Sequence, residues 1–257
     1  IRNTFRFILG NIQDTFTKQN FDKLKFEELP ELERYILNKL LEVDLSIEEN
    51  LKNYNFHKLY KDLLNFCTLE LSSFYFDIRK DTLYCDNVNS EKRKKCITVL
   101  NIILECLLKW LAPIFVFTTE EIYSLIKKDD KSIHETVFVS IPKKWKNDEL
   151  DKKWKELLKI KQEANIAIEQ KRSNKEIGSS LEAEIEIYTT NENFKLMEDL
   201  DLAEYFITSK AKKFVNENDE EKTNIIVKKS EGKKCERCWK ILENECERCA
   251  NIIKGIA

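Results

Sequence analysis

Apolar residues recur every three or four positions through the first half of the chain. Residues 31–51, 55–78 and 92–111 each carry such a stripe, which lies along one face of an α-helix. In the first stretch the stripe consists of Leu32, Ile36, Leu40, Val43, Ile47 and Leu51. Together with the helical pattern of residues 1–14, these stretches predict an antiparallel helical bundle.

Two local signals follow the third of these helices. Pro113 is expected to end or kink it. Thr118 and Glu121 have the spacing of a capping box, which predicts a short helix beginning at Thr118. The carboxylates of Glu120 and Glu121 resemble a paired acid–base site, but capping and the helix dipole explain them without catalysis.

The pattern changes after about Lys128. Residues 148–172 predict another helix, whereas residues 181–187 alternate strictly between apolar and acidic, which predicts a half-buried strand. Shorter strand candidates are residues 136–140, 206–207 and 224–227, and residues 216–223 predict an exposed loop. We therefore expect a mainly α chain with a helical bundle over residues 1–128, a small α+β module over 129–228 and a tail over 229–257.

The tail contains two Cys-x-x-Cys pairs, Cys235 with Cys238 and Cys246 with Cys249, separated by seven residues. Two such turns provide the four thiolates of a tetrahedral Zn²⁺ site. Because four sulfur ligands leave no open position for water or substrate, the expected zinc ion is structural. Two disulfides or a redox pair would use the same cysteines, but a redox Cys-x-x-Cys comes singly, which favours zinc.

Composition narrows the class of protein. The chain has only 4 Gly and 3 Pro, and 35% of its residues are charged, which is typical of a helix-rich protein. No apolar run approaches the roughly 20 residues that a membrane-spanning helix needs. The first residues are not a signal peptide, and their helical pattern indicates a fragment of something longer. The scattered Cys67, Cys85, Cys96 and Cys106 are expected to be free thiols, which together with a zinc site indicates the reducing cytosol.

The distribution of charge is more informative than its total. A net charge of −2 taken alone argues against a nucleic-acid binder. From Lys228 to Lys240, however, six basic and two acidic residues give a local charge of +4. A basic, metal-bound tip could contact phosphate, and a solvated surface run is an equal alternative.

Several segments resemble one family. Residues 1–11 (Ile-Arg-Asn-Thr-Phe-Arg-Phe-Ile-Leu-Gly-Asn), 177–184 (Ile-Gly-Ser-Ser-Leu-Glu-Ala-Glu) and 235–239 (Cys-Glu-Arg-Cys-Trp) resemble the bacterial isoleucyl-tRNA synthetases. Residues 56–85 are similar to the same enzymes, and residues 111–123 resemble a segment that the valine and leucine enzymes share. The resemblance covers nearly the whole chain in order, and it implies a helical anticodon-binding region with a zinc-binding carboxyl end.

The resemblance implies a role in binding rather than in the chemical step. The parent ligase would attach isoleucine to tRNA(Ile) with ATP and Mg²⁺, and this part would hold the anticodon arm. The family's His-x-Gly-His and Lys-Met-Ser-Lys-Ser signatures are absent, since neither His57 nor His134 has such neighbours and the only Met is Met197. We expect the adenylation and editing sites upstream, no catalytic residue in this chain, and a monomeric, cytoplasmic protein. His57 is expected to be packed or at the surface, and His134 at a strand edge.

Contacts with tRNA are expected in the tail. By resemblance, Arg237 and Trp239 lie where the zinc end meets the anticodon, and Lys233 and Lys234 belong to the adjoining basic run. An arginine can bond a base edge or a phosphate, and an indole can stack on an unpaired base. Packing of Trp239 over the metal site is an equal alternative.

The chain also departs from the family pattern. Val116 stands where the family usually has Pro, Tyr123 where it has Trp, and Thr82 where it has Arg. The seven residues between the two Cys pairs are fewer than is usual, which leaves the metal geometry intact but puts loop contacts with RNA in question.

Two other hypotheses remain. The chain could be the corresponding region of a valyl- or leucyl-tRNA synthetase, against which the zinc motif and residues 181–184 argue. It could also be a helical scaffold whose zinc ribbon binds protein. Competition between tRNA(Ile), tRNA(Val) and a non-cognate tRNA separates these hypotheses.

Overall fold

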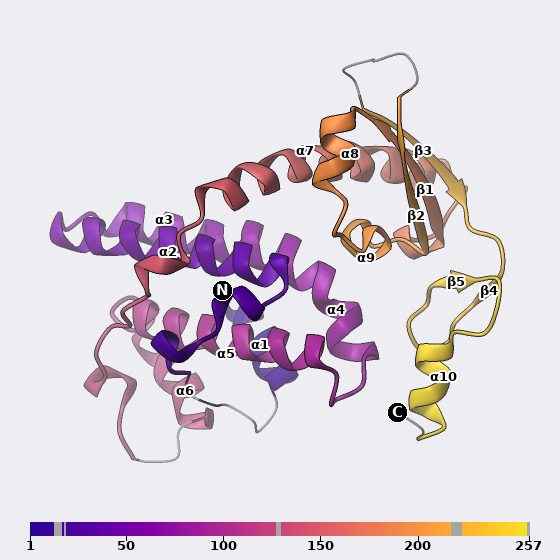
Figure 1. Cartoon of the computed structure of the whole chain (residues 1–257). Coiled ribbons are helices and arrows are strands. Elements are labelled where there is room, and N and C mark those ends of the chain that lie inside the picture. The colour runs from indigo at the N-terminus through magenta and orange to yellow at the C-terminus, as the bar shows by residue number, and fades with distance from the viewer. Residues whose placement is uncertain (13–16, 18, 127–129, 217–222, 256–257) are drawn as a thin grey trace. The chain divides into compact units, whose positions relative to one another are not determined.

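The computed structural model describes residues 1–12, 17, 19–126, 130–216 and 223–255 (Figure 1). The chain forms two compact units, one of Ile1–Phe76 with Val88–Asn147, and one of Asp77–Asn87 with Asp148–Ala257. The predicted domain boundaries after residues 128 and 228 stay a prediction. Most of the predicted loop at 216–223, and residues 13 and 14 of the first predicted helix, lie outside the described residues.

The first unit is the expected helical bundle. α2 packs against α3 and α5, while α1 and α6 each pack against α5. Its helices are α1 (Arg2–Ile12), α2 (Glu31–Lys52), α3 (Phe56–Asn65), α5 (Glu91–Leu111) and α6 (Val116–Ile126), with short 3₁₀ turns η1 (Phe21–Lys23), η2 (Phe26–Glu28), η4 (Ile133–Glu135) and η5 (Lys143–Trp145). The helices predicted over residues 31–51 and 92–111 are therefore confirmed.

α5 lies at the centre of this core. Its wholly buried side chains include Val99, Leu100, Ile102, Ile103, Leu104, Cys106, Leu107 and Leu111. They point to every side of the helix rather than along one stripe, as expected for a helix that neighbours surround. The one carboxylate in this stretch, Glu105, forms an ion pair with Lys109, with an N–O distance of 2.8 Å.

The helix predicted over residues 55–78 has a different interior. α3 continues into a π-helical segment, η3 (Phe66–Tyr75), and then into α4 (Phe76–Cys85). In the π-helical segment the Ser72 hydroxyl donates to the Cys67 carbonyl at 2.8 Å, five residues back. The apolar spacing gives no sign of this wider winding, because it is set by hydrogen bonding and packing rather than by the side-chain pattern.

The predicted capping box at Thr118 and Glu121 is wrong. α6 begins at Val116, so Thr118 lies inside the helix instead of preceding it. Glu120 stabilises a different turn, because its carboxylate accepts from the Ser132 hydroxyl at 2.7 Å, and Ser132 itself caps η4. Glu120 thus has a structural role, as expected, but one that links two segments.

The strand predicted over residues 136–140 is also wrong. The segment has no strand pairing, and Val137 and Phe138 are 81% and 48% exposed. Apolar residues in a row supply strand propensity but no partner strand. His134 accordingly lies in η4 and not at a strand edge.

The second unit is α+β. Its sheet has the order β2-β1-β3, with β1 parallel to β2 and antiparallel to β3. Besides all of α4 but its first residue, the unit includes α7 (Asp148–Ser173), η6 (Ser180–Glu182), β1 (Ala183–Thr189), α8 (Asn191–Leu196), α9 (Leu202–Phe206), β2 (Lys210–Val215) and β3 (Asn224–Lys229). α7 packs against β3, α8 and α9. The mainly α architecture with a small α+β module is therefore confirmed.

The alternation in the sequence sets the faces of β1. Ala183, Ile185 and Ile187 are wholly buried, while Glu184 and Glu186 lie on the opposite face and pair with lysines of the neighbouring strands. The predicted strand at 206–207 is wrong, since Phe206 ends α9 and Ile207 is its left-handed cap, with φ 58°. The strand predicted at 224–227 is confirmed as β3.

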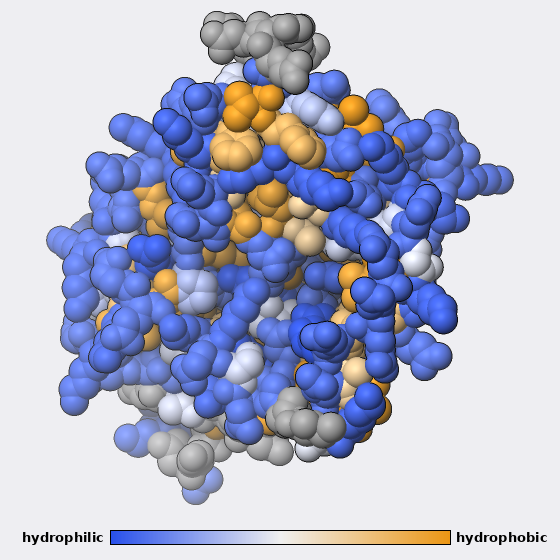
Figure 2. All heavy atoms as spheres, turned by 45° about the vertical axis from the view of Figure 1, so that its right-hand side comes forward, coloured by the Kyte–Doolittle hydropathy of each residue, from blue (hydrophilic) through white to orange (hydrophobic). Residues whose placement is uncertain are grey.

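Figure 2 shows one face that is mostly polar, with apolar residues gathered at the top of the view, near the end of β2 and the start of β3. The most exposed apolar side chains of these strands are Phe214, Val215 and Ile226. No helix in the described part of the chain combines the length and apolar character that crossing a bilayer requires.

Candidate metal and nucleic-acid site

The tail consists of a short β-hairpin followed by one short helix. β4 (Lys233–Lys234) pairs antiparallel with β5 (Ile241–Leu242), and α10 (Glu247–Ile253) follows. Gly232 precedes β4 with φ +129°, and a Cβ there would overlap the Leu242 carbonyl. This hairpin therefore requires glycine at residue 232, and it carries the first Cys pair in the turn between its strands.

The four predicted ligand cysteines converge. The sulfurs of Cys235, Cys238, Cys246 and Cys249 all lie within 4.8 Å of one another, and those of Cys238 and Cys246 are 3.9 Å apart. Four sulfurs at a Zn–S distance of about 2.3 Å lie about 3.8 Å from one another, so the cluster could hold a metal ion of this size.

The thiols of the cluster are available as ligands. All eight cysteines of the chain are free, so the disulfide alternative is not realised in this structure. Burial acts to raise the pKa of Cys235, but backbone N–H groups of Cys238 and Arg237 point at its sulfur and hold the pKa at about 7. This turn thus stabilises the thiolate of Cys235, whereas burial raises the pKa of the Cys238, Cys246 and Cys249 thiols.

Cys85 is a neighbour of the cluster that the sequence did not reveal. Its side chain is buried against Cys238 and Cys249, and its thiol contacts the Arg237 carbonyl. Cys67, Cys96 and Cys106 are buried in the helical unit, as expected. No spacing rule relates residue 85 to a motif more than 140 residues later, so only the fold brings them together.

Trp239 is exposed rather than packed over the cluster. It follows Cys238 directly, is 60% exposed, and has a left-handed backbone with φ 64°. Its N–H donates to the Cys235 carbonyl at 2.9 Å, which closes the first turn. Lys233 and Lys234 are exposed on β4 in the same tail. Three of the four residues expected to meet tRNA therefore face solvent.

The fourth, Arg237, is directed inward. Its guanidinium donates to the carbonyl of Tyr84 at 3.0 Å and to the carbonyl of Cys85, at the last turn of α4. Arg248 makes a related contact that sequence reasoning missed: it donates to both oxygens of Asp81, at 2.7 and 2.8 Å, and to Asp86 at 2.9 Å.

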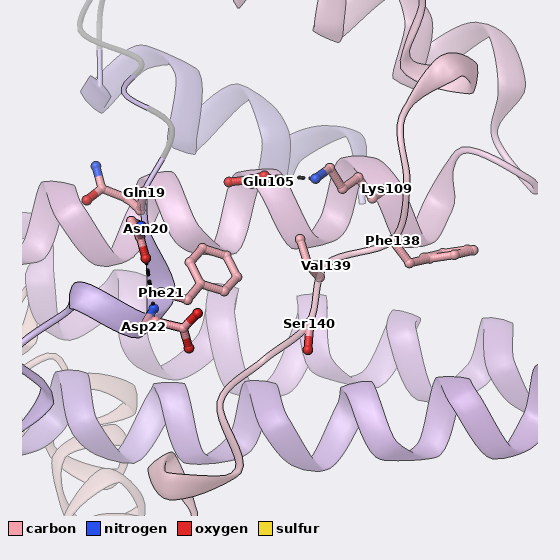
Figure 3. Close-up of a pocket in the computed structure, with 9 residues that line it drawn as sticks. All are labelled: Gln19, Asn20, Phe21, Asp22, Glu105, Lys109, Phe138, Val139 and Ser140. Carbon is pink, nitrogen blue, oxygen red and sulfur yellow. Dashed lines mark hydrogen bonds and ion pairs between the residues drawn. The ribbon is translucent and has the colours of Figure 1, made fainter.

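A pocket of about 480 Å³ lies in the helical unit (Figure 3). Within it, Glu105 forms an ion pair with Lys109, and the Asn20 side chain accepts from the backbone N–H groups of Asp22 and Lys23 in η1. The residues that line it include no Cys or His, and both histidines of the chain are exposed elsewhere.

Known proteins resemble the chain over nearly its full length. Residues 33–187 match the family described as the anticodon-binding domain of tRNA ligase. The isoleucine–tRNA ligase of Pelagibacter ubique is 53% identical over 96% of this chain. The ligases of the same name from Agrobacterium fabrum and Crocosphaera subtropica are 38% and 34% identical over 94% and 99% of it.

The match is to one part of those enzymes. The chain spans 27% of the Pelagibacter protein, 25% of the Agrobacterium protein and 30% of the Crocosphaera protein. The family match itself covers more than half of this chain and includes the helical bundle from α2 onward. The chain therefore belongs to the family of anticodon-binding domains of tRNA ligases.

Proposed function

We propose that this chain binds the anticodon arm of tRNA(Ile) as part of an isoleucine–tRNA ligase. The observation that carries the proposal is the match of residues 33–187 to the anticodon-binding domain. The relative that is 53% identical, an isoleucine–tRNA ligase, supports isoleucine over valine or leucine. Holding the anticodon arm would orient the acceptor end, which promotes the reaction by positioning rather than by chemistry at this site.

Structural Zn²⁺ is the metal that fits the four-cysteine cluster best. Four thiolates with no open position are typical of structural zinc, and the sulfur spacing supports this. The tail has few buried apolar side chains of its own, of which Ile241 is one. The ion would therefore be needed to hold the two Cys-x-x-Cys turns in a fixed conformation.

The tail supplies the groups that meet RNA. Trp239 would stack on an unpaired base, and Lys233 and Lys234 would lie along the phosphates. An exposed indole on a left-handed backbone supports the stacking role, since sparsely populated backbone conformations concentrate at functional sites. Arg237 was expected to share this role, but its guanidinium is directed at backbone carbonyls.

The other steps of the reaction belong outside this chain. In the parent enzyme, ATP, Mg²⁺ and isoleucine would react at adenylation and editing sites in the parts that this chain does not span. We further propose a monomeric protein that works in the cytoplasm, where tRNA is charged and free thiols persist.

Competition binding tests the proposal. Labelled tRNA(Ile) bound to this chain is challenged with unlabelled tRNA(Ile), tRNA(Val) and a non-cognate tRNA at several salt concentrations. We expect tRNA(Ile) to compete at least tenfold better than the others, with affinity that falls as salt rises. Preference for tRNA(Val) would favour the valine enzyme, and absence of RNA binding would favour a protein-binding scaffold.

A further inference from the structure

The two Cys-x-x-Cys turns carry the same pair of residues between their cysteines. Each reads Cys-Glu-Arg-Cys, so Arg237 and Arg248 occupy equivalent positions, as do Glu236 and Glu247. The two glutamates are exposed, whereas both arginines reach the same short segment, residues 81–86, at the end of α4. That segment belongs to the same compact unit as the tail.

Arg248 contacts the acidic side chains of this segment. Its guanidinium meets the Asp81 carboxylate with two parallel hydrogen bonds of 2.7 and 2.8 Å, and donates a third to Asp86 at 2.9 Å. The side chains of Asp81 and Asp86 are only 22% and 15% exposed. A bidentate contact of this kind fixes orientation as well as distance, because the planes of the guanidinium and the carboxylate must align.

Arg237 contacts backbone carbonyls of the same segment. Its guanidinium donates to the carbonyls of Tyr84 and Cys85, which are among the last carbonyls of α4. A cation is favoured at the carboxyl end of a helix by the helix dipole. One arginine therefore contacts the carboxylates and the other the carbonyls of a single helix end.

We infer that Arg237 and Arg248 are positioning residues, which dock the four-cysteine tail on residues 81–86 and so hold Trp239 in place for an unpaired base of RNA. The inference rests on the proposed function. The cluster itself can make the tail rigid internally, but only contacts outside it fix where the tail stands in its unit. An indole that is already held in position binds a base more tightly, because the tail loses no conformational entropy when the base stacks on it.

Arg248→Met tests the inference in the 257-residue chain, with Glu247→Gln as the matched control from the same turn. We expect Arg248→Met to keep one zinc per chain and to bind tRNA(Ile) about tenfold more weakly, while Glu247→Gln matches the wild type. If Arg248→Met binds tRNA within twofold of the wild type, the inference is wrong. Should Arg248→Met lose zinc, Asp86→Ala replaces it, because this change removes the acceptor of one Arg248 hydrogen bond. We then expect a threefold loss of tRNA affinity, and binding within twofold of the wild type would again mean that the inference is wrong.

Fluorine NMR reports on Trp239 directly. In a chain labelled with 5-fluorotryptophan, Trp239→Phe identifies its resonance among the four. Arg248→Met should shift and sharpen that resonance as the tail becomes mobile, and leave those of the buried Trp110, Trp145 and Trp154 unchanged. A general loss of structure would move all four, and an unmoved Trp239 would overturn the inference.

A double-mutant cycle separates positioning from direct contact. In a Trp239→Ala background, Arg248→Met is expected to weaken binding by less than twofold, because the arginine acts through the indole. A full tenfold loss in that background would mean that Arg248 contacts RNA itself, and would overturn the inference. If the wild type binds no tRNA, the proposed function fails. If Trp239→Ala weakens binding but Arg248→Met does not, only this inference fails.

Discussion

Trp239 combines two unfavourable properties in one residue. Its side chain is 60% exposed, and its backbone is left-handed, with φ 64°, a region that large side chains rarely occupy. Such a conformation costs on the order of 1–3 kcal/mol and persists only where the surroundings impose it. Here the turn between Cys235 and Cys238 and the hydrogen bond from the Trp239 N–H impose it. Glycine would suit this backbone better, so the backbone conformation gives no reason for an indole at this position.

Replacing Trp239 by glycine should therefore separate stability from binding. We expect Trp239→Gly to raise the resistance of the tail to zinc loss, because glycine adopts positive φ without strain. The same variant should bind tRNA(Ile) at least tenfold more weakly, since stacking on an aromatic contributes about 1–3 kcal/mol per base. Trp239→Phe, which keeps a ring, serves as the control in titrations with labelled tRNA. Equal tRNA affinity for Trp239→Gly and wild type would dismiss the stacking role.

Among the helices and strands, those that depend on the local pattern of apolar and polar residues could be predicted from the sequence. The stripe of α2 and the alternation of β1 place most of their apolar side chains on the buried face, so these elements could be predicted. The π-helical segment Phe66–Tyr75 and the unpaired residues 136–140 could not, because winding and strand pairing depend on neighbours distant in sequence. The same holds for Cys85 and Asp81, which meet the tail only through the fold.

The tail should depend on metal as a single element. A chelator, or Cys246→Ser, is expected to unfold residues 229–257 and leave the rest of the chain folded, since structural zinc contributes on the order of 10–16 kcal/mol in small domains. Limited proteolysis with mass spectrometry would locate the cuts, and far-ultraviolet circular dichroism would follow the helices. Cys85→Ser is the matched control, because Cys85 packs on the cluster without belonging to the four. Simultaneous melting of tail and bundle would speak against an independent metal-held element.

At the scale of the whole molecule, the chain joins a helical bundle to an α+β unit that carries the tail. A net charge of −2 hides a local +4 between Lys228 and Lys240, so the total says little about nucleic-acid binding. The family could be predicted from short segments near both ends and is confirmed by the match over residues 33–187. The direction of Arg237 could not be predicted, because the resemblance assigns a place in the chain and not the partner of the guanidinium.

The most direct test of the whole account is a nuclease footprint of tRNA(Ile) bound to this chain. We expect protection confined to the anticodon loop and its stem, lost from the loop in Trp239→Ala and unchanged in Glu247→Gln. Protection of the acceptor arm with an accessible anticodon loop would contradict the assignment of this chain to anticodon binding.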